Sequence, residues 1–178
     1  GLLSRPGTVQ WRYIQGGSQT YVQAFQSAFP GRIRLNTAVQ AVDRQNQDSP
    51  VVRCRDGDER FDSVVMAVHA DQALSLLPDA DDLETKALAP WQYSRNRTVL
   101  HRDLSLMPHN KKAWACWNVL RPAPEQTNQK VRVTYWMNRL QRLPAQDQWL
   151  VSLNPDQDCA PGTKVYETMY EHPVYTME

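Results

Sequence analysis

The chain has 178 residues, and 41% of them are hydrophobic, enough for a core in one domain or in two small ones. Its 20 basic and 19 acidic side chains leave a net charge of +1. A charge this small gives no electrostatic reason to expect binding to nucleic acid or to an anionic membrane. No apolar run approaches the roughly 20 residues that span a bilayer, and no signal peptide begins the sequence. Three cysteines without C-x-x-C spacing argue against a disulfide framework or a zinc site, so we expect a protein of the reducing cytoplasm.

The first 35 residues predict a strand, a glycine turn, a helix and a second strand. The strand Val9–Ile14 leads to Gly16-Gly17, Ser18 is a good N-cap, and apolar residues then recur at helical spacing until Pro30-Gly31. Residues 32–35 are predicted to form a further short strand. Two roles for the glycine pair stay open: a tight turn before the helix, or a phosphate contact at the helix N-terminus. The full dinucleotide pattern G-x-G-x-x-G is absent.

Three runs then predict an antiparallel meander. In residues 38–44, Val39, Ala41 and Asp43 alternate with the residues between them, and residues 51–56 form the second strand. Asp56-Gly57 is a strong hairpin dipeptide. The third run, residues 60–70, is apolar from Val64 to Val68, as expected of a strand buried on both faces.

The remainder predicts two helices and then a sheet. Leucines in residues 70–78 indicate one helix, and residues 81–91 indicate another, capped by Asp81 or Asp82 and ended by Pro90. Alternating runs predict five strands, at residues 95–103, 112–121, 130–140, 148–155 and 164–175. The fold class is therefore α+β: a helix with a three-stranded β-meander, followed by a mixed or antiparallel β-sheet with helices.

Histidines and tryptophans are the side chains that suggest chemistry. The four histidines are candidates for acid–base roles, and the alternative is that each is an ordinary strand or loop residue. Trp114 and Trp117 are three positions apart, so on one strand they face opposite sides and only one could line a shared pocket. Core packing or a wall for an apolar ligand would each explain them. The candidate substrate pocket consists of Trp114, Trp117 and His101.

Residues 11–79 together resemble the flavin-containing amine oxidase superfamily. The segments that carry the resemblance are the Gly-Gly-Ser turn with its helix, the meander, and "VVMAVHADQAL". "YSRNRTVLHRDLSLMPHNKKAWACWN" and "YEHPVY" are similar to the bacterial branch of predicted NAD/FAD-binding proteins. The resemblance implies residues 1–78 as part of an FAD-binding domain and residues 79–178 as a substrate-binding β-sheet region. It also implies that the glycine loop holding the FAD pyrophosphate lies outside this chain, so that the phosphate grip is not at Gly16-Gly17.

The same resemblance implies cofactor contacts and an activity. In relatives, the valine matching Val39 contacts the adenine end of FAD through its backbone, and Ala67 is a second cofactor-binding candidate. The chain would be the central fragment of an FAD-dependent oxidoreductase that transfers hydride from a small, lipid-like substrate to the flavin. The fragment alone would be inactive and bind FAD poorly, and no catalytic base is identified. The alternatives are a non-enzymatic α+β module that binds a ligand or partner, and an NAD(P)-binding protein without flavin.

Overall fold

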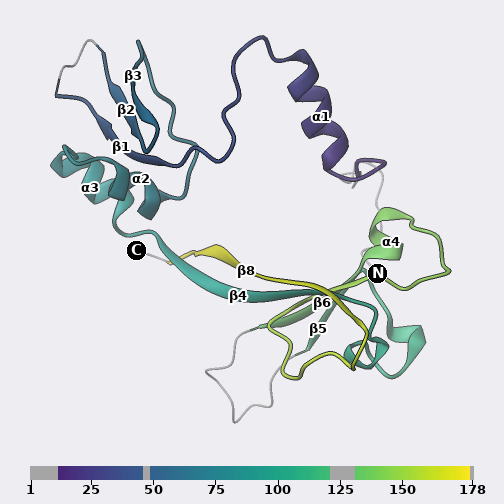
Figure 1. Ribbon diagram of the computed structural model, residues 1–178. Coiled ribbons are helices and arrows are strands. Elements are labelled where there is room, and N and C mark those ends of the chain that lie inside the picture. Colours follow the sequence, from purple (N-terminus) through teal and green to yellow (C-terminus); the bar gives the residue numbers. More distant parts are fainter. Residues whose placement is uncertain (1–11, 46–48, 121–130, 177–178) are drawn as a thin grey trace, which may run out of the picture. The chain divides into compact units, whose positions relative to one another are not determined.

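The computed structural model describes residues 12–45, 49–120 and 131–176. The chain forms two compact units, whose elements are labelled in Figure 1. The meander unit comprises Gly31–Ser94 and Glu171–Glu178, and the five-strand unit comprises Gly1–Pro30 and Arg95–Tyr170. The functional division into residues 1–78 and 79–178 stays a prediction.

The meander unit contains a three-stranded antiparallel sheet in the order β1-β2-β3. Its strands are β1 (Val39–Asp43), β2 (Val51–Cys54) and β3 (Gly57–Arg60). Three strands were predicted, but the third is Gly57–Arg60 rather than residues 60–70. Cys54 pairs with Gly57, so that a two-residue loop joins β2 to β3, and Gly57 adopts a φ of 129° that favours glycine. The predicted Asp56-Gly57 dipeptide therefore marks the turn: Asp56 lies in the loop, and Gly57 is the first paired residue of β3.

A β-bulge between Val39 and Ala41 breaks the alternation expected for β1. Val39 pairs with Cys54 and Val42 pairs with Val52. Val39 and Val42 are three positions apart on β1, whereas their partners on β2 are two positions apart. Paired residues share a face of the sheet, and so do residues two apart on one strand. Val39 and Val42 therefore lie on one face, with Val52 and Cys54, whereas strict alternation places them on opposite faces.

Two helices, α2 (Ala70–Leu76) and α3 (Asp82–Leu88), belong to the same unit, close to their predicted positions. Asp81 caps α3: its carboxylate accepts a hydrogen bond from the Glu84 backbone N–H at 2.8 Å, and the Glu84 carboxylate accepts one from the Asp81 N–H. Of the two predicted caps, Asp81 is the correct one.

The five-strand unit is built around a sheet in the order β5-β6-β7-β4-β8. The strands are β4 (Gln92–His101), β5 (Trp117–Leu120), β6 (Arg132–Trp136), β7 (Leu150–Leu153) and β8 (Lys164–Val174), so all five predicted strands are present. The boundary between the units falls within β4 and β8. Two 3-10 turns, Leu104–Leu106 and Lys111–Ala113, follow β4, and the short helix α4 (Met137–Gln141) follows β6.

Val99 and Leu150 are fully buried at the centre of this sheet, beside a chain of polar groups. His101 Nε2 lies 2.8 Å from Ser152 Oγ, which lies 2.7 Å from Thr134 Oγ1. The three side chains come from β4, β7 and β6, which are neighbours in the sheet. Burying these polar atoms is tolerated because each has a hydrogen-bond partner.

Gly16 and Gly17 turn the chain into α1 (Gln19–Ala28). The Gly17 N–H donates to the Ile14 carbonyl at 3.1 Å, and Gly16, third in this turn, has a φ of 83° that a type II turn requires. The Gly17 carbonyl then accepts from the Thr20 hydroxyl at 2.8 Å. Ser18 occupies the predicted N-cap position, but its side chain makes no capping hydrogen bond; the turn and helix are confirmed.

Four local predictions are wrong. Residues 32–35 and Arg12–Ile14 form no strand, and Val9–Trp11 lie outside the described residues. Met137–Leu140, predicted as the end of a strand, form a helix. Val64–Val68 form no strand, because a strand needs a hydrogen-bonded neighbour and no described strand pairs with this run. Val65 is 91% exposed rather than buried.

Candidate functional site

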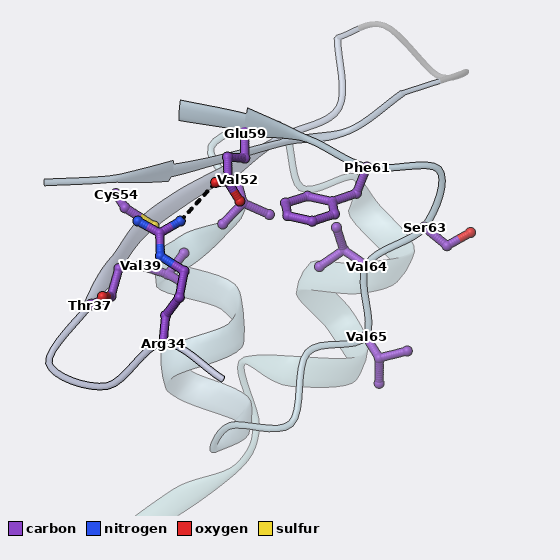
Figure 2. Close-up of a pocket in the computed structure, with 10 residues that line it drawn as sticks. All are labelled: Arg34, Thr37, Val39, Val52, Cys54, Glu59, Phe61, Ser63, Val64 and Val65. Carbon is purple, nitrogen blue, oxygen red and sulfur yellow. Dashed lines mark ion pairs between the residues drawn. The ribbon is translucent and has the colours of Figure 1, made fainter. Parts of the chain in front are cut away.

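A cavity of about 360 Å³ lies in the meander unit, on the face of the sheet that the bulge assembles (Figure 2). Its lining comes from the residues just before β1, from all three strands, and from the residues that follow β3. The lining residues are Arg34, Thr37, Val39, Val52, Cys54, Glu59, Phe61, Ser63, Val64 and Val65. Its size and its mainly apolar lining with a few polar groups are typical of small-molecule sites.

Strand register explains why these side chains meet. Glu59 pairs with Val52, which shares a face with Cys54 and hence with Val39. The bulge is essential, because without it the Val39 side chain would sit on the opposite face. β1 is also an edge strand, with β2 as its one neighbour in the sheet, so its other side carries backbone N–H and C=O groups outside that ladder.

An ion pair forms the polar part of the cavity wall. Arg34 Nη1 lies 3.1 Å from Glu59 Oε1, and Figure 2 draws the two side chains directed toward each other. The side chains are 33% and 43% exposed, so water screens their attraction and the pair adds little to stability. It does place donor N–H groups and a carboxylate acceptor side by side, above apolar side chains.

The two predicted cofactor-binding residues have different surroundings. Val39 lines the cavity and is 39% exposed. Ala67 is also exposed but lies in the unpaired run after the cavity residues and does not line it. The cavity residues Arg34, Glu59 and Phe61 were missed by sequence reasoning, because only the register of β1, β2 and β3 brings them together.

The predicted substrate-pocket residues are separated. His101 is fully buried and lines none of the described cavities: its Nδ1 accepts from the Asp103 N–H at 3.1 Å and its Nε2 bonds Ser152. Trp114 lies before β5 rather than on it, donates from Nε1 to the Pro108 carbonyl at 2.8 Å, and packs edge-on against Trp136 at 5.2 Å. These contacts are those of packing residues.

Trp117, in contrast, lies on β5 and is 49% exposed beside a second cavity, of about 320 Å³, in the five-strand unit. The remaining lining residues are Arg12, Tyr13, Met137, Leu140 and Gln141. This cavity combines aromatic and aliphatic surface with one cation and one amide, a lining that suits an apolar or amphipathic molecule.

A third cavity, of about 550 Å³, is lined by charged groups of the meander unit around Arg44. Arg44 Nη2 donates to Asp79 Oδ1 and to Glu84 Oε2, both at 2.9 Å, and thereby ties the end of β1 to the α2–α3 region. The hydrogen bond from Arg44, followed by that from the Asp81 N–H, lowers the pKa of Glu84 to about 2. Because these three charges are paired with one another, the cluster is best explained as a structural link.

Metal and membrane features are not found in the part of the chain that the structure describes. No group of three or more His, Cys, Asp or Glu side chains there could hold a metal ion. No described helix has the length and apolar character needed to cross a bilayer. The three cysteines are free thiols.

Solved structures share this fold. The chain matches a CLA-producing fatty acid isomerase from P. acnes with a TM-score of 0.57 and 14% identity, covering 88% of this chain and 40% of that one. It matches a predicted protoporphyrinogen oxidase from Exiguobacterium sp. 255-15 with a TM-score of 0.53 and 18% identity, covering 77% of this chain and 29% of that one. The chain thus spans less than half the length of either. A comparison with curated protein sequences gave no significant match.

The family model described as "Flavin containing amine oxidoreductase" matches residues 4–101. That range includes α1, the whole β-meander with its cavity, both helices α2 and α3, and β4. It covers more than half of the sequence and contains the meander segments on which the superfamily resemblance rests. The chain belongs to the flavin-containing amine oxidoreductase family.

Proposed function

We propose that this chain is the central portion of an FAD-dependent oxidoreductase, and that the cavity beside Val39 receives the adenine end of FAD. The observation that carries the proposal is the bulge of β1, which puts Val39 at the start of an edge strand and on the cavity face. Backbone groups of an edge strand can bond the rim of a base while apolar side chains contact its face. The cavity residues therefore fit an adenine ring.

When bound, FAD supplies the redox chemistry, by accepting hydride from a substrate C–H bond. The residues described here would bind and orient the adenosine end and exclude water from it. The unpaired run Val64–Val68 supports a larger assembly, because its apolar side chains suit burial in a further sheet that would supply the phosphate-binding glycine loop. We further propose that the intact protein belongs to the bacterial NAD/FAD-binding branch and acts in the cytoplasm.

Two spectroscopic measurements test the proposal. The full gene product should be yellow, and its flavin absorbance should bleach anaerobically with an oxidisable substrate. The present chain, titrated with FAD, should show binding weaker than micromolar and no turnover, because the pyrophosphate-binding loop is missing from it. Saturable micromolar binding by the chain alone would contradict its interpretation as a central fragment. A full product that stays colourless after FAD is added would favour a non-enzymatic binding module.

The substrate proposed for the intact enzyme is an apolar, lipid-like molecule. The cavity beside Trp117 supports this choice, since Tyr13, Met137 and Leu140 surround the indole with apolar surface. Titration of the chain with sodium oleate below its micelle concentration should shift tryptophan fluorescence. The shift should be absent in Trp117→Leu and retained in Trp91→Leu, whose indole belongs to the meander unit. Equal responses of both variants would remove support for this site.

A further inference from the structure

We propose that the Arg34–Glu59 ion pair is a specificity element that reads the amino edge of an adenine base in the meander cavity. The inference rests on the proposed function, because it concerns the same cavity. It goes beyond a backbone contact at Val39, since it assigns the choice of base to two side chains. These side chains come from segments 25 residues apart and meet across the sheet face (Figure 2).

The pair has hydrogen-bonding capacity left over. A guanidinium carries five N–H donors and a carboxylate has two oxygens with about four acceptor sites. The ion pair joins Nη1 to Oε1 at 3.1 Å, and both side chains remain partly exposed. Donor groups of Arg34 and acceptor sites of Glu59 are therefore available to a ligand without breaking the pair.

Adenine has an edge that matches this arrangement. It presents an N6 amino donor next to the N7 acceptor on one edge. An Arg34 N–H can donate to the ring nitrogen while the N6 amino group donates to the Glu59 carboxylate. Each hydrogen bond then involves one charged partner, which makes it stronger than a neutral one.

The rest of the cavity suits the faces of the ring rather than its edge. Val39 and Val52 offer apolar surface on the strand side, and the aromatic ring of Phe61 lines the cavity from the run that leaves β3. Bases stack on aromatic side chains without regard to sequence, because every base has a π face. Phe61 and the valines therefore contribute affinity for any base, and the ion pair contributes the selection among bases.

A nucleotide titration followed by NMR tests the assignment. Adenosine 5′-monophosphate and purine riboside 5′-monophosphate, which lacks only the N6 amino group, are added separately to ¹⁵N-labelled chain. We expect both to shift the amide signals of Thr37 and Val39, with the adenosine compound binding at least about fivefold more tightly, because hydrogen bonds to charged groups are among the strongest. This comparison needs no substitution, so it remains decisive if a variant fails to fold.

Variants locate the preference in the ion pair. In Glu59→Met, which removes the acceptor for the N6 amino group, the preference should fall to less than about twofold. Arg34→Met removes the donor to the ring nitrogen that both nucleotides share, so both nucleotides should bind more weakly. The matched control is Arg53→Met, which breaks the Arg53–Asp43 ion pair of 2.6 Å on the opposite face of the same sheet and should leave the preference intact. Dispersed amide signals from β1, β2 and β3 verify folding.

Each outcome separates the two proposals. Cavity shifts with equal affinity for both nucleotides would overturn the role of the ion pair and leave the adenine site standing. So would a preference that persists in Glu59→Met. Absence of any shift at Thr37 and Val39 up to the solubility limit of the nucleotides would overturn the adenine site itself, and the specificity element with it.

Discussion

Ser152→Ala should destabilise the five-strand unit by about 2 kcal/mol, because Ser152 is the middle member of a buried polar chain. Its hydroxyl lies 2.8 Å from His101 Nε2 and 2.7 Å from Thr134 Oγ1. Ser152, His101 and Thr134 are 1%, 0% and 4% exposed, so water cannot reach them in the folded state. The substitution removes one oxygen atom and leaves the backbone unchanged.

The magnitude follows from the tautomer of His101. Its Nδ1 accepts a hydrogen bond from the Asp103 N–H at 3.1 Å, so the proton of a neutral ring is on Nε2 and points at Ser152. Loss of the Ser152 hydroxyl leaves this N–H buried without an acceptor, which costs about 1–3 kcal/mol. The space left by one oxygen atom is too small to admit a water molecule in its place.

Urea unfolding followed by tryptophan fluorescence measures the effect, since Trp136 and Trp149 report on the five-strand unit. Ser18→Ala is the matched control: Ser18 belongs to the same unit, its side chain is exposed and makes no capping hydrogen bond, and the variant should stay within about 0.5 kcal/mol of the original chain. If both alanine variants lose equal stability, then the buried chain does not depend on the Ser152 hydrogen bonds and the reasoning fails.

Three further predictions concern pH, a helix cap and the glycine turn. Burial lowers the pKa of His101, against the opposing charge of Asp103, so its neutral form is favoured in the folded state. Stability should be full above the unfolded pKa of about 6.5 and should decline as the pH falls below it. In His101→Phe, the urea midpoint should change less between about pH 7 and 5. Asp81→Ala should lower the free energy of unfolding of the meander unit in urea by about 1 kcal/mol, because it removes the cap of α3. Asp82→Ala, one residue along and outside the capping box, should cost clearly less. Equal losses in the two variants would contradict the cap. Gly16→Ala should cost about 1–2 kcal/mol of local stability, because the φ of 83° disfavours a side chain and the new Cβ would lie 2.8 Å from a methyl group of Thr20. The loss should appear as faster amide hydrogen exchange in α1. Unchanged exchange would refute this prediction.

Local sequence signals predicted most elements of the fold. Apolar spacing located α1, the Asp81 cap located the start of α3, and alternation located the five strands of the larger sheet. These signals succeed because each depends on residues close together in the sequence. Apolar alternation also misassigned Met137–Leu140 as strand, because four residues are too few to distinguish the two periods.

Errors arose where the outcome depends on distant residues. The run Val64–Val68 has the composition of a buried strand, yet a strand forms only beside a neighbour, and no described segment supplies one. The bulge at Val39 likewise leaves no mark in the sequence, because a single unpaired residue depends on the register with β2.

The candidate site was predictable only in part for the same reason. Val39 came from the family resemblance, not from spacing. Arg34 and Glu59 look like ordinary exposed charges in the sequence, and their proximity emerges only when β3 pairs with β2. Trp117 was predicted from its aromatic character, which indicates a pocket wall or a core residue with equal ease.

The order of strands in the larger sheet has a consequence for synthesis of the chain. β4 lies between β7 and β8, so it leaves the ribosome about fifty residues before β7 supplies its first partner and longer still before β8 arrives. At about 5–20 residues per second, β4 waits for seconds with both edges open, next to a meander that can already have folded. A nascent strand of this kind is a natural substrate for chaperones, and slowing translation after His101 should increase aggregation of the nascent chain rather than improve its folding.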